Sequence, residues 1–188
     1  RDAIHGDLAI TPEQHQRLVE SFARIDAEMI GWSRAATLAE VPAPDLPYQP
    51  PTPRTYRPRI GVIGTGGIVS AHLDAYRTAG WEVAALCNRT LSKAEAKAAE
   101  FAPLAHVTDR WEDVLNNPDI DVVDITPHPV DRLPIIEAAL RAGKHVLSQK
   151  PFVLDLKEGR RLVALARDNG LKLAVNQNGR WAPHLAYM

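Results

Sequence analysis

Cysteine is almost absent from this sequence of 188 residues, since Cys87 is the only one. A single cysteine excludes an internal disulfide framework and fits a reducing compartment, so we expect a cytoplasmic protein. A basic excess is also absent, because 22 Lys and Arg stand against 23 Asp and Glu. Binding along a nucleic-acid backbone needs such an excess. No apolar run approaches the roughly 18 residues that span a membrane. We therefore expect neither nucleic-acid nor membrane partners.

Metal-ligand spacing is missing as well. The seven histidines contain no His-x-x-x-His pair, and no Cys-His cluster is present. Structural and catalytic metal sites are built on such clusters, so we expect no metal site. Cys87 ends a predicted strand and is interpreted as a buried small apolar residue rather than a nucleophile.

Apolar residues make up 45% of the chain, which is enough for a sizeable core. Seven of the 15 prolines fall between Pro42 and Pro58, and this density predicts an extended connector rather than a helix or an inner strand. Before it, an apolar stripe at helical spacing follows Thr11-Pro12-Glu13, which is typical of a helix start. We predict an N-terminal helix and proline-rich arm over residues 1–57, a main domain over 58–178, and the start of a further domain over 179–188.

After residue 58, apolar strand patterns alternate with helical ones. The predicted strands cover residues 60–63, 82–87, 121–126, 144–147 and 171–175. Helices are predicted between them, and three of these helices are predicted to end at Gly80, Gly143 and Gly170. N-terminal capping boxes are formed by Ser92, Asp109 and Asp155, each followed three residues later by Glu. Strands separated by helices require crossover connections, so the sequence predicts an α/β fold with a doubly wound parallel sheet.

A glycine turn joins the first predicted strand to the following helix. It reads Gly64-Thr65-Gly66-Gly67-Ile68, with Val69 where a third small residue is usual. In dinucleotide-binding folds such glycines permit a tight turn and let the backbone approach a pyrophosphate, while the helix N-terminus supplies N–H donors. The alternative is a purely structural turn. The strand-turn-helix context favours a phosphate site over all five residues.

The end of the second predicted strand is where such folds recognise the ribose. Enzymes that bind NAD usually carry Asp or Glu there, whereas this chain has Asn88-Arg89-Thr90. An amide does not repel a 2′-phosphate, and Arg89 can pair with one through a charge-assisted fork. Thr90 can add a hydroxyl. The pattern favours NADP, although NAD stays possible if Arg89 is only a solvated loop residue.

The stretch from Ile60 to Pro183 resembles the glucose–fructose oxidoreductase and inositol dehydrogenase family (Gfo/Idh/MocA). Besides the glycine turn, the resemblance rests on Asp124-Ile125-Thr126-Pro127 and on the run Ala-Gly-Lys-His-Val-Leu-Ser-Gln-Lys-Pro over residues 142–151. The segment Asn176-Gln177-Asn178-Gly179-Arg180-Trp181-Ala182-Pro183 is also similar to the family. The match covers about two-thirds of the chain and implies a Rossmann cofactor-binding domain.

The resemblance implies roles for residues at the ends of the later strands. Thr126 and Pro127 match the turn that borders the nicotinamide, and His128 either borders it too or is a surface-loop residue. Lys150 matches the family lysine placed against the reacting hydroxyl or carbonyl, where an ammonium can polarise a carbonyl or stabilise an alkoxide. Gln149 stands where the family more often has Glu; it can bind a ribose hydroxyl but cannot pair with Lys150 by charge.

The residues after the last predicted strand are open to two interpretations. Asn176, Arg180 and Trp181 either touch cofactor or substrate, or serve as packing and salt-bridge residues. The family's catalytic Asp and His lie in a following α/β domain, which we expect to be missing here. We therefore expect the cofactor-binding half of an oxidoreductase, inactive alone and a homo-oligomer at full length, acting on a sugar, inositol or related polyol.

Two other function classes fit parts of the pattern. The first is a non-catalytic nucleotide-binding or sensing protein on the same fold, because fold does not fix function. The second is a Rossmann-type methyltransferase that binds S-adenosylmethionine. The N-terminal helix and arm could also serve assembly by wrapping a neighbouring subunit. Ligand titration, substitution of Lys150 and deletion of the arm separate these readings.

Overall fold

The structure is a computed structural model of the chain, which describes residues 53–177 together with residues 13, 16, 17, 20 and 179. The chain divides into two compact units, Arg1–Asp45 and Leu46–Met188. In the first, the four described residues are helical, and Arg17 pairs with Glu13 at 3.1 Å. These residues agree with the helix predicted after Pro12. Most of the predicted proline connector lies outside the described residues.

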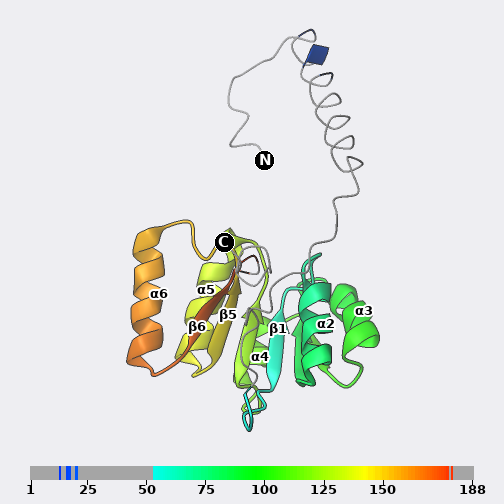
Figure 1. Cartoon of the computed structure of the whole chain (residues 1–188), viewed down its shortest axis with the longest axis vertical. Coiled ribbons are helices and arrows are strands. Elements are labelled where there is room, and N and C mark those ends of the chain that lie inside the picture. The colour runs from blue at the N-terminus through cyan, green and yellow to red at the C-terminus, as the bar shows by residue number, and fades with distance from the viewer. Residues whose placement is uncertain (1–12, 14–15, 18–19, 21–52, 178, 180–188) are drawn as a thin grey trace, which may run out of the picture. The chain divides into compact units, whose positions relative to one another are not determined.

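The second unit is built on a parallel sheet of six strands in the order β3-β2-β1-β4-β5-β6 (Figure 1). The strands are β1 (Ile60–Ile63), β2 (Val83–Cys87), β3 (His106–Thr108), β4 (Val122–Ile125), β5 (His145–Gln149) and β6 (Leu173–Asn176). The helices are α2 (Val69–Ala79), α3 (Leu91–Phe101), α4 (Trp111–Asn116), α5 (Pro129–Arg141) and α6 (Leu156–Asp168). This order is that of the doubly wound nucleotide-binding fold, which confirms the predicted fold class.

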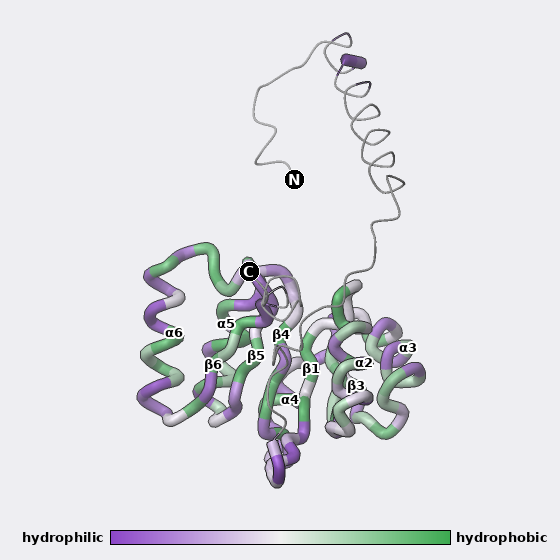
Figure 2. Tube along the Cα trace, viewed as in Figure 1, coloured by the Kyte–Doolittle hydropathy of each residue, from purple (hydrophilic) through white to green (hydrophobic). Residues whose placement is uncertain are grey.

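Two hydrophobic clusters hold the sheet between its helices. One joins α2 and α3 to β1 and β2 through residues such as Val62, Leu73 and Ala94. The other joins α4, α5 and α6 to the opposite side of the central strands through Val123, Ile136 and Leu162. The central strands are buried on both faces, and parallel strands of this kind are continuous apolar runs in sequence. Their green colour in Figure 2 marks these apolar residues. The packing fixes the strand ends that carry the polar residues.

The predicted C-terminal ends of the helices agree with the structure better than the predicted N-terminal starts. The predicted ends hold, since Gly80, Gly143 and Gly170 lie just past α2, α5 and α6 with φ of 69°, 76° and 67°. At the starts, the Asp155 carboxylate caps α6 by accepting from Lys157 N at 2.7 Å. The predictions for Ser92 and Asp109 were wrong. Thr90 and Arg110 are the N-cap residues of α3 and α4, and neither cap uses its side chain.

The start of α4 shows why the capping prediction failed there. Thr108, at the end of β3, accepts from Arg110 N at 3.1 Å and donates to the Asp113 carboxylate at 2.7 Å. The hydroxyl of Thr108 therefore binds the N-cap residue and a residue of the first turn of α4, which ties the start of this helix to the end of β3. The strand β3 itself was not predicted, because its three residues are too few for a visible alternation.

Candidate functional site

The carboxyl ends of all six strands meet at one edge of the parallel sheet. The glycine turn follows β1, Asn88 follows β2, Thr126 follows β4 and Lys150 follows β5. Strands β1 and β4 are neighbours, so the chain reverses its direction of winding between them. Ligands of open α/β sheets bind at this switch point, outside the carboxyl ends of the strands. Most of the residues singled out in the sequence therefore lie along one edge.

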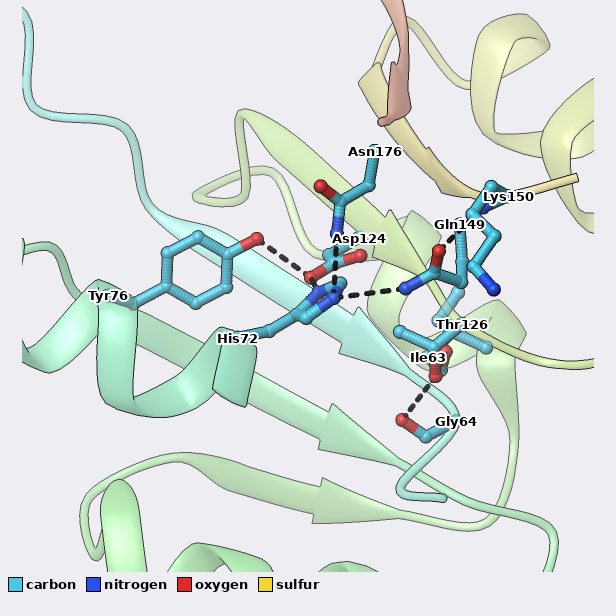
Figure 3. A network of polar contacts seen from close by, with 9 residues as sticks. All are labelled: Ile63, Gly64, His72, Tyr76, Asp124, Thr126, Gln149, Lys150 and Asn176. Atoms are coloured by element: carbon cyan, nitrogen blue, oxygen red, sulfur yellow. Dashed lines mark hydrogen bonds and ion pairs between the residues drawn. The ribbon is translucent and has the colours of Figure 1, made fainter. Parts of the chain in front are cut away.

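Gly64 brings the first turn against the strand on the other side of the switch point. Its φ is +93°, and a Cβ at this position would lie 2.6 Å from Thr126 Oγ1 and 2.9 Å from Pro127 Cδ. The Gly64 N–H donates to Cys87 O at 2.8 Å. The Thr126 hydroxyl donates to Gly64 O at 2.9 Å (Figure 3). Only glycine fits this tight turn, as predicted, and Thr126 fastens the turn to β4.

The rest of the turn is open. Gly66, Gly67 and Ile68 are exposed, and no heavy atom lies within 4 Å of a Cβ built on either glycine. Neither an acidic residue nor a side-chain cap occupies the first turn of α2. Thr65 is buried, and its hydroxyl has no hydrogen-bond partner. Free N–H donors, an open approach and the positive end of a helix dipole fit a pyrophosphate.

Of the three residues after β2, the first supports the glycine turn with its side chain, and the other two are exposed. The side-chain Oδ1 of Asn88 accepts from Thr65 N at 3.2 Å, and its side-chain Nδ2 donates to Thr90 O at 3.0 Å. Asn88 thus holds the end of β2 against the glycine turn. Arg89 and Thr90 are exposed beside it. Their side chains, rather than that of Asn88, are the groups at this position free to meet a ribose or its phosphate.

A buried polar network, absent from the sequence predictions, lies behind the edge (Figure 3). Asp124 is fully buried on β4, and its Oδ2 accepts from Tyr76 at 2.7 Å and contacts His72 Nδ1 at 2.7 Å. Burial raises the pKa of Tyr76, and the charge of Asp124 raises it further. The tyrosine therefore stays protonated as a donor. Spacing of four residues on α2 places His72 and Tyr76 on the same face.

The network reaches the carboxyl edge of the sheet through Gln149, which is only 7% exposed. Its Oε1 accepts from Lys150 N at 2.6 Å, so its Nε2 is the atom 3.2 Å from His72 Nε2. Asn176 Nδ2 lies 2.9 Å from the same ring nitrogen. His72 Nε2 must accept, so Nδ1 carries the proton and donates to Asp124. The His72 ring joins the ends of β5 and β6 and fixes the orientation of the Gln149 amide.

Lys150 follows Gln149 at the end of β5 and is exposed, with a cis peptide bond to Pro151. Its backbone N–H is held by the Gln149 side chain, while its own amine has no partner within the described part of the chain. Lys150 is thus accessible at the carboxyl edge of the sheet. The neighbouring Arg132, which was not singled out as a site residue, is buried on α5 and contacts the same turn.

The remaining predicted residues have the following places. Thr126 and Pro127 are half-buried after β4, and His128 is exposed as the N-cap residue of α5. Arg180 and Trp181 lie outside the described residues. Cys87 is buried, and burial together with Asp109, Glu112 and Asp113 raises the pKa of its thiol to about 12. The prediction that Cys87 is buried is therefore confirmed.

Within the described ranges, no helix combines the length and apolar character needed to cross a membrane. The same residues contain no group of three or more His, Cys, Asp or Glu side chains arranged to hold a metal ion.

Residues 58–177 match the family model GFO_IDH_MocA, described as an oxidoreductase family with an NAD-binding Rossmann fold. The chain belongs to this family. The predicted resemblance is thereby confirmed, and the matched range covers the sheet, the glycine turn and the turn of Lys150.

Similar proteins include reductases and dehydrogenases. The 1,5-anhydro-D-fructose reductase of Ensifer adhaerens is 34% identical over 124 residues, which are 65% of this chain and 37% of that protein. The inositol 2-dehydrogenase of Salmonella typhimurium is 30% identical over 117 residues, or 61% of this chain and 35% of that protein. This chain thus spans little more than a third of the length of these curated relatives.

Two solved structures resemble the fold. A 3-ketoreductase from Actinomadura kijaniata, in complex with NADP and TDP-benzene, has a TM-score of 0.61 and 33% identity. The match covers 64% of this chain and 37% of that one. A scyllo-inositol dehydrogenase from Lactobacillus casei, with bound NAD(H) and scyllo-inositol, has a TM-score of 0.62 and 25% identity, covering 68% and 38%.

Proposed function

We propose that this chain binds NADP(H) at the open glycine turn and forms the cofactor-binding part of an oxidoreductase that acts on a sugar, inositol or related polyol. The observation that supports this most is the exposed turn Gly66-Gly67-Ile68 at the N-terminus of α2, with Lys150 exposed at the same sheet edge. Relatives in this family include a sugar-derivative reductase and inositol dehydrogenases.

Preference for NADP rests on the end of β2. Arg89 and Thr90 are exposed there, and no carboxylate occupies the position that would repel a 2′-phosphate. A hydrogen bond to a charged group contributes about 1.5–3 kcal/mol, so Arg89→Gln should weaken NADPH binding roughly 10- to 100-fold. NADH affinity should not change. Arg110→Gln, a change of an exposed arginine after β3, is the matched control. Equal NADPH affinity in Arg89→Gln and wild type would contradict the assignment.

Lys150 is the proposed catalytic residue. Once bound, the nicotinamide cofactor accepts or supplies the hydride. The Lys150 amine would donate to the substrate oxygen, polarising a carbonyl during reduction or stabilising an alkoxide during oxidation. Lys150→Ala should abolish turnover in the protein that carries this chain and leave NADPH affinity within about twofold. This chain by itself is expected to bind cofactor with little or no turnover.

A non-catalytic cofactor-binding role is the alternative. It is favoured by one observation, since Gln149 is bound to His72 and the Lys150 backbone and cannot charge-pair with the Lys150 amine. Turnover that survives unchanged in Lys150→Ala would refute the catalytic role of the lysine. Binding of S-adenosylmethionine in place of NADPH would support a methyltransferase instead.

Assembly and location complete the proposal. We propose a homo-oligomer at full length, in which residues 1–57 contribute to assembly, and a cytoplasmic location consistent with the single cysteine. Deleting residues 1–57 should lower the number of chains per particle, calculated from the mass in solution measured by light scattering. An unchanged number of chains per particle would remove the assembly role of the arm.

A further inference from the structure

Arg132 is a buried cation that holds three backbone carbonyls at the cofactor edge. It is 1% exposed on the first turns of α5. Its Nε donates to Pro127 O at 2.9 Å, in the turn after β4. Its Nη1 donates to the carbonyls of Gln149 and Pro151, the latter at 2.7 Å, and lies 3.3 Å from Ser148 Oγ. These two carbonyls flank Lys150 on either side.

The charge of this guanidinium is not neutralised by an ion pair. Among the residues that the structure describes, no carboxylate oxygen lies within 4 Å of it. Burial lowers the pKa of Arg132, yet an arginine stays charged in proteins. A buried charge is costly to desolvate unless hydrogen bonds satisfy it. The carbonyls of the two turns therefore stabilise the charged guanidinium, and the guanidinium in return fixes the two turns.

The Lys150 turn is therefore fixed from both sides of its backbone. The Gln149 side chain holds the Lys150 N–H, and Arg132 holds the carbonyls before and after the lysine. Through Pro127 the same guanidinium ties this turn to the turn after β4, across two neighbouring strands. The Arg132 side chain thus connects the Lys150 turn to the turn after β4 at the carboxyl edge of the sheet.

We propose that Arg132 is a positioning residue, which holds the Lys150 turn against the Thr126-Pro127 turn so that the nicotinamide end of the cofactor site is formed. The proposal rests on the proposed function. It predicts an effect confined to one end of the cofactor, because every hydrogen bond that Arg132 makes to a described residue lies at the ends of β4 and β5, and none reaches the glycine turn or the end of β2.

Lys144 provides a matched control at the other edge of the sheet. It is also a buried cation on a loop, 7% exposed, and its Nζ donates to Asn117 O at 2.7 Å and Ile120 O at 2.9 Å. It precedes β5, whereas the Lys150 turn follows it. A substitution there removes the same kind of contact without touching the cofactor edge.

The experiment compares two ligands on the 188-residue chain. NADPH carries the nicotinamide, and adenosine 2′,5′-bisphosphate lacks it. In Arg132→Gln, calorimetry should show NADPH affinity reduced about 10-fold, the equivalent of one lost contact, with bisphosphate affinity within about twofold of wild type. Arg132→Lys keeps a donor and should recover part of the loss. Lys144→Gln should change the affinity ratio of the two ligands by less than about twofold.

Amide hydrogen exchange supplies a readout that needs no cofactor. Arg132→Gln should speed exchange in residues 148–153 and 127–131 by at least about 10-fold relative to the rest of the sheet, because local opening costs less there. Unchanged exchange in both segments, or an equal loss of affinity for both ligands, would overturn the proposal.

Two further results are decisive. If neither Arg132→Gln nor Arg132→Lys folds by circular dichroism, the arginine supports the whole domain and the positioning role is refuted. If the wild-type chain binds neither nucleotide, the proposed function fails, while the exchange comparison still decides whether Arg132 holds the turn.

Discussion

Separate substitutions of Gly64 and Gly66 distinguish a glycine that the fold requires from a glycine that ligand binding requires. In Gly64→Ala the new methyl would enter a residue with φ of +93°, at 2.6 Å from Thr126 Oγ1 and 2.9 Å from Pro127 Cδ. The left-handed conformation costs a residue with a Cβ about 1–2 kcal/mol. Overpacking against Pro127 adds about 1–3 kcal/mol. The expected loss of unfolding free energy is therefore about 2–5 kcal/mol.

Gly66→Ala has the opposite expectation. Its φ is outside the left-handed range, and the new Cβ would meet no heavy atom within 4 Å. The stability should therefore stay within about 1 kcal/mol of wild type, with a gain permitted because alanine restricts the unfolded chain. The methyl would instead occupy the space through which a pyrophosphate approaches the backbone. We expect NADPH affinity to fall at least about 10-fold.

Thermal unfolding and calorimetric titration of both variants test this pair. At about 3 °C per kcal/mol for a domain of this size, Gly64→Ala should lower Tm by about 6–15 °C, and Gly66→Ala by less than about 3 °C. A Tm for Gly64→Ala within 2 °C of wild type would refute the reasoning from close approach. NADPH binding that survives intact in Gly66→Ala would refute the assignment of the turn as the phosphate site.

Three further predictions concern the network, the helix surface and the thiol. Tyr76→Phe removes the donor to the buried Asp124 carboxylate, so urea unfolding should show a loss of about 1.5–3 kcal/mol. Hydrogen bonds from Arg161, then from Arg141, lower the pKa of Glu137 from 4.5 to about 2. Its stabilisation is thus complete above pH 4.5 and lost as the pH falls through 2. Glu137→Gln should lower stability by at most about 1 kcal/mol at pH 7, with the difference vanishing near pH 2. The Cys87 thiol, with a pKa near 12, should resist iodoacetamide at pH 7.5 until the chain unfolds.

Each of these has a contrary result. A Tyr76→Phe variant as stable as wild type would mean that Asp124 is satisfied by His72 alone. A Glu137→Gln difference that persists unchanged at pH 2 would show that the effect is not electrostatic. Alkylation of Cys87 in the native chain at a rate close to that of the unfolded chain would show that the end of β2 opens readily.

Much of the fold was predictable because its signals are local. Strand β1, the glycine turn and α2 follow one another within 20 residues, and each is specified by its own pattern. The helix-ending glycines are equally local, since a positive φ at Gly143 is set by one residue. Strand β3 was missed because three residues give no period. The start of α4 was missed because Thr108 binds it from the preceding strand, outside the helix.

The candidate site was predicted less completely, since its contacts join distant parts of the chain. His72 lies 52 residues from Asp124 and 104 from Asn176 along the sequence. One signal was present: Asp124 interrupts the apolar run of β4, and a buried carboxylate needs donors. No local sequence pattern indicated that His72 and Tyr76 are those donors. Arg132 was not singled out, because no pattern in sequence shows that three carbonyls converge on it.

Calorimetric titration of the chain with NADPH and NADH tests the central claim most directly. The account predicts saturable binding of one NADPH per chain, with affinity at least about 10-fold above that for NADH because Arg89 meets the 2′-phosphate. Absence of binding heat with NADPH, or saturable binding of S-adenosylmethionine instead, would contradict it.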